Sequence, residues 1–283
     1  MNGYLFRLGT TSYIIPADIL PNVRYLAGKV QDVELVLFEV DDGPGNLPSS
    51  KQIAELAGIA RDQDMTYTVH LPLDLRLADD GSPRHASLEK ARRVIDHTRE
   101  LDPWAYVLHL DGKSVRRGST PEARQRWLEQ AVQSLQLVGV WAGDVKKLAV
   151  ENLEGYPLDF YDQVLERIAV SRTIDIGHLW LDGHDPVAYL RNALPRTRVI
   201  HIHGVAGRDH RSLAEMPPGT LHAVLDYLLQ SAYSGVLTIE VFSEDDFVTS
   251  CAAMEAILNE NIEQGVAATP AGGKPPCSEG RHK

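Results

Sequence analysis

Eight short runs of apolar and β-branched residues alternate along the chain with longer segments of helical periodicity, which limits the folds it can adopt. We interpret the runs as strands at Phe6–Thr10, Val33–Glu39, Thr66–His70, Tyr106–His109, Leu148–Asn152, Thr173–Asp175, Val199–His203 and Leu237–Val241. Helical patterns fill most gaps, at Lys51–Arg61, Ser87–Leu101, Glu122–Ala142, Phe160–Ile168 and Leu221–Gln230. A strand spacing of about 25–40 residues predicts parallel strands with crossover helices. Eight such units predict an α/β fold, the closed (β/α)8 TIM barrel.

An open, doubly wound sheet is the alternative to a barrel. It is disfavoured because neither G-x-G-x-x-G nor G-x-x-x-x-G-K-[ST] follows the first strand. We expect residues 1–260 to form a single catalytic domain. Residues 261–283 are rich in Gly, Pro, Ala, Ser and charge, and are predicted to be a disordered tail.

The charge balance bears on the partners of the chain. It has 28 Lys and Arg residues against 39 Asp and Glu residues, a net charge of −11, whereas nucleic-acid binding needs a basic surface. No apolar stretch approaches the ~20 residues needed to cross a bilayer, and Met1–Thr10 lacks the apolar run of a secretory signal. We therefore expect a cytoplasmic protein that binds neither nucleic acid nor membrane. The sequence leaves its oligomeric state open.

Histidine or carboxylate side chains lie in or at the end of almost every predicted strand. They are Glu39, His70, His109, Glu151, Asp175, His201, His203 and Glu240. Burying one unpaired ionisable group costs several kcal/mol, so one group per strand needs a common explanation. A metal centre supplies it, because strand ends converge at the catalytic face of a barrel and these side chains bind Zn²⁺, Fe²⁺ or Mn²⁺.

The residues differ in how strongly they support a metal centre. Glu151 and Glu240 are the strongest candidates, because they stand among apolar residues in AVEN and TIEV. Asp175 and His178 leave one strand together in DIGH, although the aspartate could simply cap the next helical turn. His109 taken alone could be a hydrogen-bonded core residue, and Glu39 could pair with an arginine.

Several segments between Leu8 and Phe242 resemble the xylose-isomerase-like barrel superfamily, which includes endonuclease IV-type phosphodiesterases and sugar isomerases and epimerases. HLPLDLRL from His70 and HLDG from His109 are similar to histidine motifs of the endonuclease branch. AVENLEG, DIGH, HIHG and the last-strand glutamate also match. The resemblance implies that the metal ligands are His70, His109, Glu151, Asp175, His178, His201, His210 and Glu240. It implies one to three divalent ions, with zinc or manganese favoured.

Two details modify this expectation. Epimerases of the superfamily tend not to need both early histidines, so the presence of His70 and His109 favours a multinuclear phosphodiesterase-like centre. The endonuclease branch also has an Asp-x-His pair after strand seven. Here the segment reads GRDHRSL, so that His210 matches the histidine, Arg208 takes the aspartate position and Asp209 is off register. One metal could therefore be missing, moved or held differently.

A narrower resemblance is to the cobamide-remodelling group of this superfamily, CbiR. It is carried by TSYIIPADILPNVRYLAGKVQDVELVLFE, HLPLDLRL, TIDIGHLWLDG and HIHGVAGRDHRSL. The resemblance implies metal-dependent hydrolysis of the phosphodiester in the nucleotide loop of a cobamide such as adenosylcobalamin, with Glu151 and Glu240 as catalytic residues. Expected substrate-binding residues are Tyr13, Glu39, Trp180, His203, Arg208 and Arg211.

Other functions stay open at this stage. A single-metal sugar isomerase or epimerase is the main alternative, with Glu151 and Glu240 exchanging protons on either side of a carbon centre. A DNA-repair endonuclease is disfavoured by the acidic charge. A non-catalytic binding module would capture a ligand without turning it over.

Overall fold

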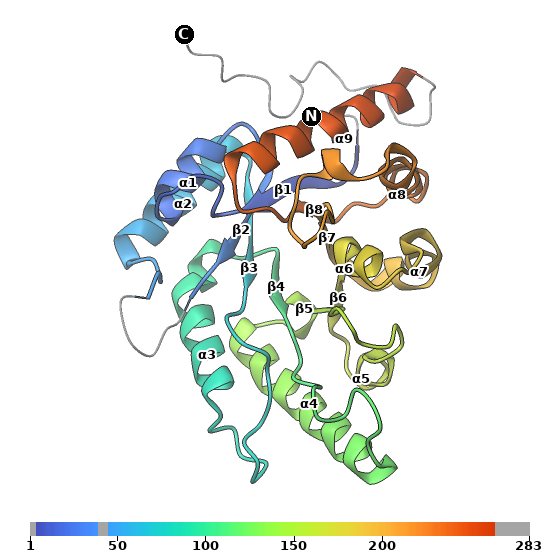
Figure 1. The fold of residues 1–283 in the computed structure, drawn as a ribbon. Helices are drawn as coiled ribbons and strands as arrows, with labels where there is room; N and C mark the ends of the chain where they lie inside the picture. The colour runs from blue at the N-terminus through green and yellow to red at the C-terminus, as the bar shows by residue number, and fades with distance from the viewer. Residues whose placement is uncertain (1–3, 39–44, 264–283) are drawn as a thin grey trace.

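Eight parallel strands form a closed barrel in the computed structural model, which describes residues 4–38 and 45–263 (Figure 1). Each strand pairs with its successor, and β8 pairs with β1. The strands are β1 (Arg7–Thr11), β2 (Asp32–Val36), β3 (Thr66–His70), β4 (Ala105–Leu108), β5 (Leu148–Glu151), β6 (Ser171–Asp175), β7 (Thr197–Ile202) and β8 (Val236–Ile239). The (β/α)8 barrel predicted from the strand–helix alternation is confirmed.

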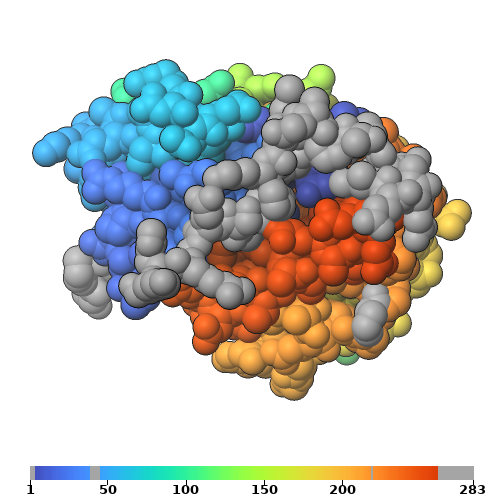
Figure 2. All heavy atoms as spheres, turned by 90° about the horizontal axis from the view of Figure 1, so that it is seen from above, coloured from blue at the N-terminus to red at the C-terminus, as the bar shows by residue number. Residues whose placement is uncertain are grey.

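Helices surround the barrel. They are α1 (Ile19–Leu26), α2 (Ser50–Gln63), α3 (Ala86–Thr98), α4 (Pro121–Ala142), α5 (Asp162–Arg167), α6 (Ile176–Leu181), α7 (Pro186–Ala193), α8 (Pro218–Gln230) and α9 (Glu244–Glu263). Short 3-10 turns lie at Arg99–Leu101, Val145–Lys147, Leu194–Arg196 and Leu213–Glu215. Figure 2 shows α9 lying across the molecule between the blue α1–α2 side and the orange α8. No described helix is long and apolar enough to span a membrane.

Local sequence signals explain where the longer helices begin and end. The α2 helix begins with a capping box in which Ser49 and Gln52 bond each other's backbone N–H groups. The α4 helix begins at Thr120, whose side chain accepts from the Ala123 N–H, and it ends at Gly143 with a φ of 79°. Glycine suits this left-handed position because it has no Cβ to clash with the preceding turn.

The predicted and observed element boundaries differ by a few residues. The β2 strand ends at Val36 rather than at Glu39, which lies outside the described residues. The short helices α1, α6 and α7 were not predicted, because six to eight residues carry too little periodicity. The last helix, α9, ends at Glu263, three residues beyond the expected end of the catalytic domain.

The carboxyl half of the barrel interior is polar. On β2, the apolar Val33 and Leu35 alternate with Asp32 and Glu34, and all four are buried. The Glu34 carboxylate lies 2.8 Å from a ring nitrogen of His201 on β7. Since β2 and β7 are not neighbours, Glu34 must reach across the inside of the barrel. The pleat therefore directs carboxylates inward and aliphatic side chains toward the helices.

Candidate metal centre

Glu151 lies at the middle of a cluster of histidines and carboxylates at the carboxyl end of the barrel. It is the last residue of β5 and only 2% exposed. One carboxylate oxygen, Oε2, lies 3.1 Å from His109 Nε2 and 3.5 Å from His70 Nε2. The other, Oε1, lies 3.2 Å from His201 Nδ1. The two oxygens of one side chain thus face two different groups of potential ligands.

The first group consists of His70, His109 and Glu151, whose ligand atoms all lie within 4.8 Å of one another. His70 Nδ1 lies 2.9 Å from the Leu71 carbonyl, and His109 Nδ1 lies 3.2 Å from Asp74 Oδ1. When each Nδ1–H donates to these acceptors, each Nε2 is left free to bind a metal ion.

Neighbouring charges shift the pKa values of the ionisable side chains in and beside this group. Burial alone would lower the pKa of His109, but its hydrogen bonds and charge interactions with Asp74 and Glu151 raise that pKa to about 10. The hydrogen bond from His109 lowers the pKa of Asp74 to about 2, against the opposing effect of burial. The pocket therefore stabilises a cation between these carboxylates.

The second group contains four buried residues, Glu151, Asp175, His201 and Glu240, again with ligand atoms within 4.8 Å. His201 Nδ1 lies 3.2 Å from both Glu151 and Glu240, while its Nε2 lies 2.8 Å from Glu34. Burial alone would lower the pKa of His201, yet Glu34, Glu240 and Glu151 raise it well above its usual value. Glu34 fixes the ring so that Nδ1 faces the two other glutamates.

Further histidines border the second group on the side of β6 and β7. Asp175 Oδ1 accepts the His178 N–H at 2.7 Å and so caps α6, while the ligand atoms of Asp175, His178 and His203 lie within 4.8 Å of one another. His178 Nδ1 lies 3.0 Å from the Asn152 carbonyl. His210 Nδ1 lies 3.2 Å from Asp209, and its Nε2 lies 3.6 Å from Glu240. The off-register aspartate therefore contacts the outer nitrogen of His210.

The donor atoms fit a divalent metal ion. Among the described residues, the carboxylate oxygens Glu34 Oε1, Asp175 Oδ2 and Glu240 Oε2 of this centre are buried without a hydrogen-bond partner. Such atoms are rare in native proteins, because a buried polar group that stays unpaired costs free energy. Imidazole and carboxylate donors are typical of Zn²⁺ and Mn²⁺ sites.

The predicted substrate-binding residues occupy different environments after the strands. Tyr13 follows β1 and packs against Phe38 at a centroid distance of 5.5 Å, and Trp180 is half-buried in α6. Arg208 is exposed in the loop after β7, whereas Arg211 donates to Glu215. His203 is fully buried. These placements leave their roles as proposals, and Glu39 lies outside the described residues.

Sequence reasoning missed two residues that orient histidines, Glu34 and Asp74. A signal existed for Glu34, because it stands between Val33 and Leu35 in a predicted strand, as Glu151 stands among apolar residues. No comparable signal existed for Asp74. It reaches His109 through the path of the loop after β3, which linear spacing does not define.

The fold and the site together define a (β/α)8 barrel with a histidine–carboxylate centre at the carboxyl ends of its strands. The profile of the family described as "Xylose isomerase-like TIM barrel" matches residues 29–268. The chain belongs to this family. No curated protein matches the sequence significantly.

Solved structures with the same fold include proteins of two functional kinds. A D-tagatose 3-epimerase-like protein is 22% identical with a TM-score of 0.69, over 92% of this chain and 100% of that one. Endonuclease IV from Thermus thermophilus is 17% identical with a TM-score of 0.65, over 90% of this chain and 99% of that one. At these identities the likeness establishes the fold alone.

Proposed function

We propose that this protein is a metal-dependent hydrolase that cleaves the phosphodiester in the nucleotide loop of a cobamide, using two or more divalent ions such as zinc or manganese. The observation that carries the proposal is the position of Glu151. Its Oε2 faces His70 and His109, while its Oε1 faces His201. A carboxylate shared in this way can bridge two ions, whereas a single-metal centre needs no ligands on the His70 side.

Bound ions would polarise the phosphoryl oxygens and make hydroxide available near neutral pH. The residues of this chain would supply position and charge. Glu151 would orient the nucleophile between the two groups, and Glu240 would hold the opposite side through its contacts with His201 and His210. Glu34 and Asp74 would keep the imidazoles aligned by accepting from their outer nitrogens.

The rim of the barrel supports a bulky, partly apolar substrate. Four large apolar side chains are exposed in the segments after β2, β3, β6 and β8, namely Phe38 at 49%, Leu73 at 41%, Leu181 at 37% and Phe242 at 45%. Phe242 also packs against His210, with ring centroids 5.2 Å apart. Apolar side chains around a few convergent polar groups are typical of small-molecule sites. A corrin ring could rest on them while Arg208, exposed in the loop after β7, meets the phosphate.

Hydrolysis of adenosylcobalamin by the Glu151→Gln variant tests this proposal. Wild-type protein loaded with Zn²⁺ or Mn²⁺ should release a cobinamide-phosphate-type product, detected by mass spectrometry. We expect turnover to fall by at least ~10³-fold in the variant, a size typical of losing a central electrostatic group. Glu154→Gln is the matched control, because Glu154 is exposed in the same segment. Wild-type turnover by Glu151→Gln would contradict the assignment.

A sugar epimerase is the second candidate. The observation that favours it is that Glu151, Asp175, His201 and Glu240 form a complete four-ligand group without His70 or His109. This function predicts one tightly bound ion, and epimerisation of ketoses that survives His109→Asn. Release of cobamide products by the wild type, together with their loss in His109→Asn, would exclude it.

A further inference from the structure

We infer that His203 is a positioning residue that holds His210 and Asp175 in place, although its ring also belongs to two groups of potential metal ligands, one with Asp175 and His178 and one with His210 and Glu240. The inference rests on the proposed metal-dependent function, because it concerns two residues of the same centre. His203 follows β7 directly and is 0% exposed. Asp175 and His201 are equally buried, so the role of His203 is argued from its contacts.

The other histidines of the centre share one arrangement. One ring nitrogen of each lies beside an oxygen acceptor, so the second nitrogen can face inward with its lone pair. These acceptors are the Leu71 carbonyl for His70, Asp74 for His109, the Asn152 carbonyl for His178, Glu34 for His201 and Asp209 for His210. This arrangement is that expected of metal-ligating imidazoles.

His203 also has an oxygen acceptor beside Nδ1, the Gly204 carbonyl, but its Nδ1 has a further contact with a hydrogen-bond donor. Its Nδ1 receives the backbone N–H of His210 at 3.0 Å. A backbone N–H can only donate, so Nδ1 must be the unprotonated nitrogen in this geometry. The Gly204 carbonyl, 3.2 Å from the same atom, is the more distant partner and would require the opposite tautomer. In the tautomer that accepts the His210 N–H, the proton lies on Nε2, where a metal ligand would need a lone pair.

The protonated Nε2 faces Asp175. It lies 3.4 Å from Asp175 Oδ1, and in the described part of the chain neither Nε2 nor Asp175 Oδ2 has a hydrogen-bond partner. A small movement would complete this contact, as hydrogen bonds in active sites often tighten when the site is filled. His203 would then fix the carboxylate that caps α6 and belongs to the second group.

His203 also contacts His210, on the loop after β7. His210 has a φ of 52°, in the left-handed region that costs free energy for a residue with a Cβ. The hydrogen bond to His203 Nδ1 and the stacking of the two rings, with centroids 4.4 Å apart, stabilise this conformation. His203 thereby links a strained ligand on the loop after β7 with a buried ligand on β6.

Glycine at position 177 makes this arrangement possible. A Cβ at Gly177 would lie 2.1 Å from His203 Cε1, far inside contact distance. The glycine of DIGH therefore admits the imidazole of HIHG between β6 and β7. Gly177→Ala should displace His203 while leaving the identity of every proposed metal ligand unchanged.

Two substitutions separate the two contacts of His203. His203→Asn keeps an acceptor near the Nδ1 position and removes the Nε2 donor, whereas His203→Gln keeps a donor near Nε2 and removes the Nδ1 acceptor. Loss of an outer partner weakens metal affinity by about 10–100-fold in comparable sites. We expect a weakening of this size, measured by competition with a chelator, in both variants and in Gly177→Ala. The matched control is His222→Asn, which changes a half-buried histidine on α8.

Long-range proton–nitrogen correlation on histidine-labelled, Zn²⁺-loaded protein provides the decisive readout. His203, assigned by the signals lost in His203→Asn, should show a protonated Nε2 and an unprotonated Nδ1. A zinc-bound Nε2 would overturn the inference in favour of direct ligation. Unchanged metal affinity in all three variants, with the wild type still binding metal, would also overturn it while leaving the proposed function standing. A wild type that binds no divalent ion would instead remove the proposed function itself.

Discussion

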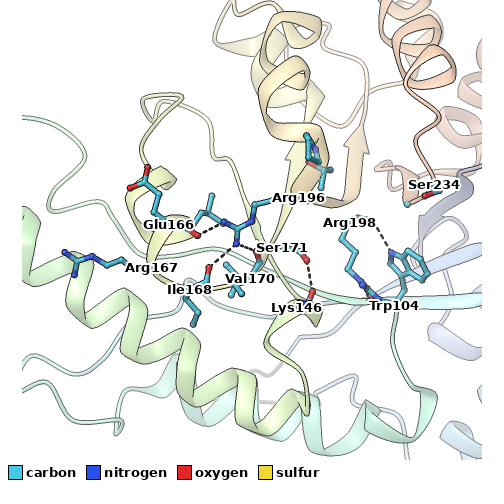
Figure 3. A pocket seen from close by; sticks show the side chains of 15 residues that line it. Trp104, Lys146, Glu166, Arg167, Ile168, Val170, Ser171, Arg196, Arg198 and Ser234 are labelled. Atoms are coloured by element: carbon cyan, nitrogen blue, oxygen red, sulfur yellow. Dashed lines mark hydrogen bonds between the residues drawn. The ribbon is translucent and has the colours of Figure 1, made fainter.

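The two ends of the barrel both collect charged side chains, but they satisfy them differently. At the amino end, a pocket of about 740 Å³ is lined by residues that include Arg196, Arg198 and Trp104 (Figure 3). Arg196 donates to the carbonyls of Leu165, Ile168 and Val170, and Arg198 donates to the carbonyl of Trp104. At the carboxyl end, several buried carboxylate and imidazole atoms have no hydrogen-bond partner among the described residues.

Unpaired buried polar atoms also occur outside the centre, as at Asp32 and Tyr156, so the convergence of histidines and carboxylates, rather than cavity size, locates the site. The guanidinium groups at the amino end donate hydrogen bonds to backbone carbonyls that would otherwise lack donors. This role is structural. The carboxyl-end atoms are arranged for a bound group that the chain itself does not supply. The division agrees with the general behaviour of TIM barrels, in which the carboxyl face is catalytic and the amino face stabilises the fold.

After Glu151, we expect substitution of Glu34 to have the largest effect on the centre at the carboxyl end of the barrel. Glu34→Leu removes the acceptor of His201 Nε2, so the ring can turn and its Nδ1 no longer faces Glu151. We expect metal affinity and turnover to fall by about 10–100-fold. Glu34→Gln keeps an oxygen acceptor and should recover part of both. Equal losses in the two variants would indicate that the charge of Glu34, rather than its hydrogen bond, is what matters.

At the amino end, we expect Arg196→Met to lower stability and to leave turnover unchanged. It leaves three backbone carbonyls without their charged donor, at a cost of about 2–3 kcal/mol in the free energy of unfolding. Turnover per folded molecule should be unchanged. Denaturant unfolding measures the first quantity, and Arg167→Met, on the exposed rim of the same pocket, is the control. A loss of turnover without a loss of stability would mean that the amino-end pocket also serves the reaction.

Asp32 and Glu34 are two buried carboxylates on the same strand, β2, and Asp32 lies two residues before Glu34. Burial raises the pKa of Asp32 to about 7, opposed by the hydrogen bond that the Thr66 hydroxyl donates to Asp32 Oδ2. The folded protein therefore binds this proton more tightly than the unfolded chain, and stability falls as pH rises from about 4 to about 7. Asp32→Asn should remove this dependence and stabilise the protein above pH 7 by roughly 1–3 kcal/mol. Equal pH profiles for the two proteins would show that Asp32 stays ionised when folded.

The smallest expected effect is at the apolar rim. Phe38→Ser removes an exposed ring that packs against Tyr13 and should raise KM for adenosylcobalamin several-fold, while kcat is retained. Val140→Ser changes an apolar residue on α4 that is more exposed than Phe38, and serves as the control. A fall in kcat without a change in KM would argue against a substrate-contact role for Phe38.

Much of the fold could be predicted from the sequence because its signals are local. Strand periodicity, helix caps and the alternation of elements are all encoded in short segments, and the eight strands follow them. The centre could be predicted where a histidine or carboxylate stands at a strand end, as with His70 and Glu151. Parallel strands necessarily bring those ends together.

Other parts of the centre depend on register and loop path, which short segments do not encode. Glu39 was predicted at the end of the second strand and Glu34 was not, because alternation along a strand does not by itself show which face points into the barrel. The contacts of Asp74 with His109 and of His203 with His210 arise from loops folding back on the barrel. They could be recognised only from the structure.

The number of divalent ions bound per chain tests the central claim most directly. Native mass spectrometry of the wild type and of His109→Asn, each loaded with Zn²⁺ and then freed of excess metal, gives this number. We expect at least two ions in the wild type and one fewer in His109→Asn, because His109 belongs to the group on the Oε2 side of Glu151. A single ion in both proteins would contradict a bridging Glu151 and favour the epimerase function.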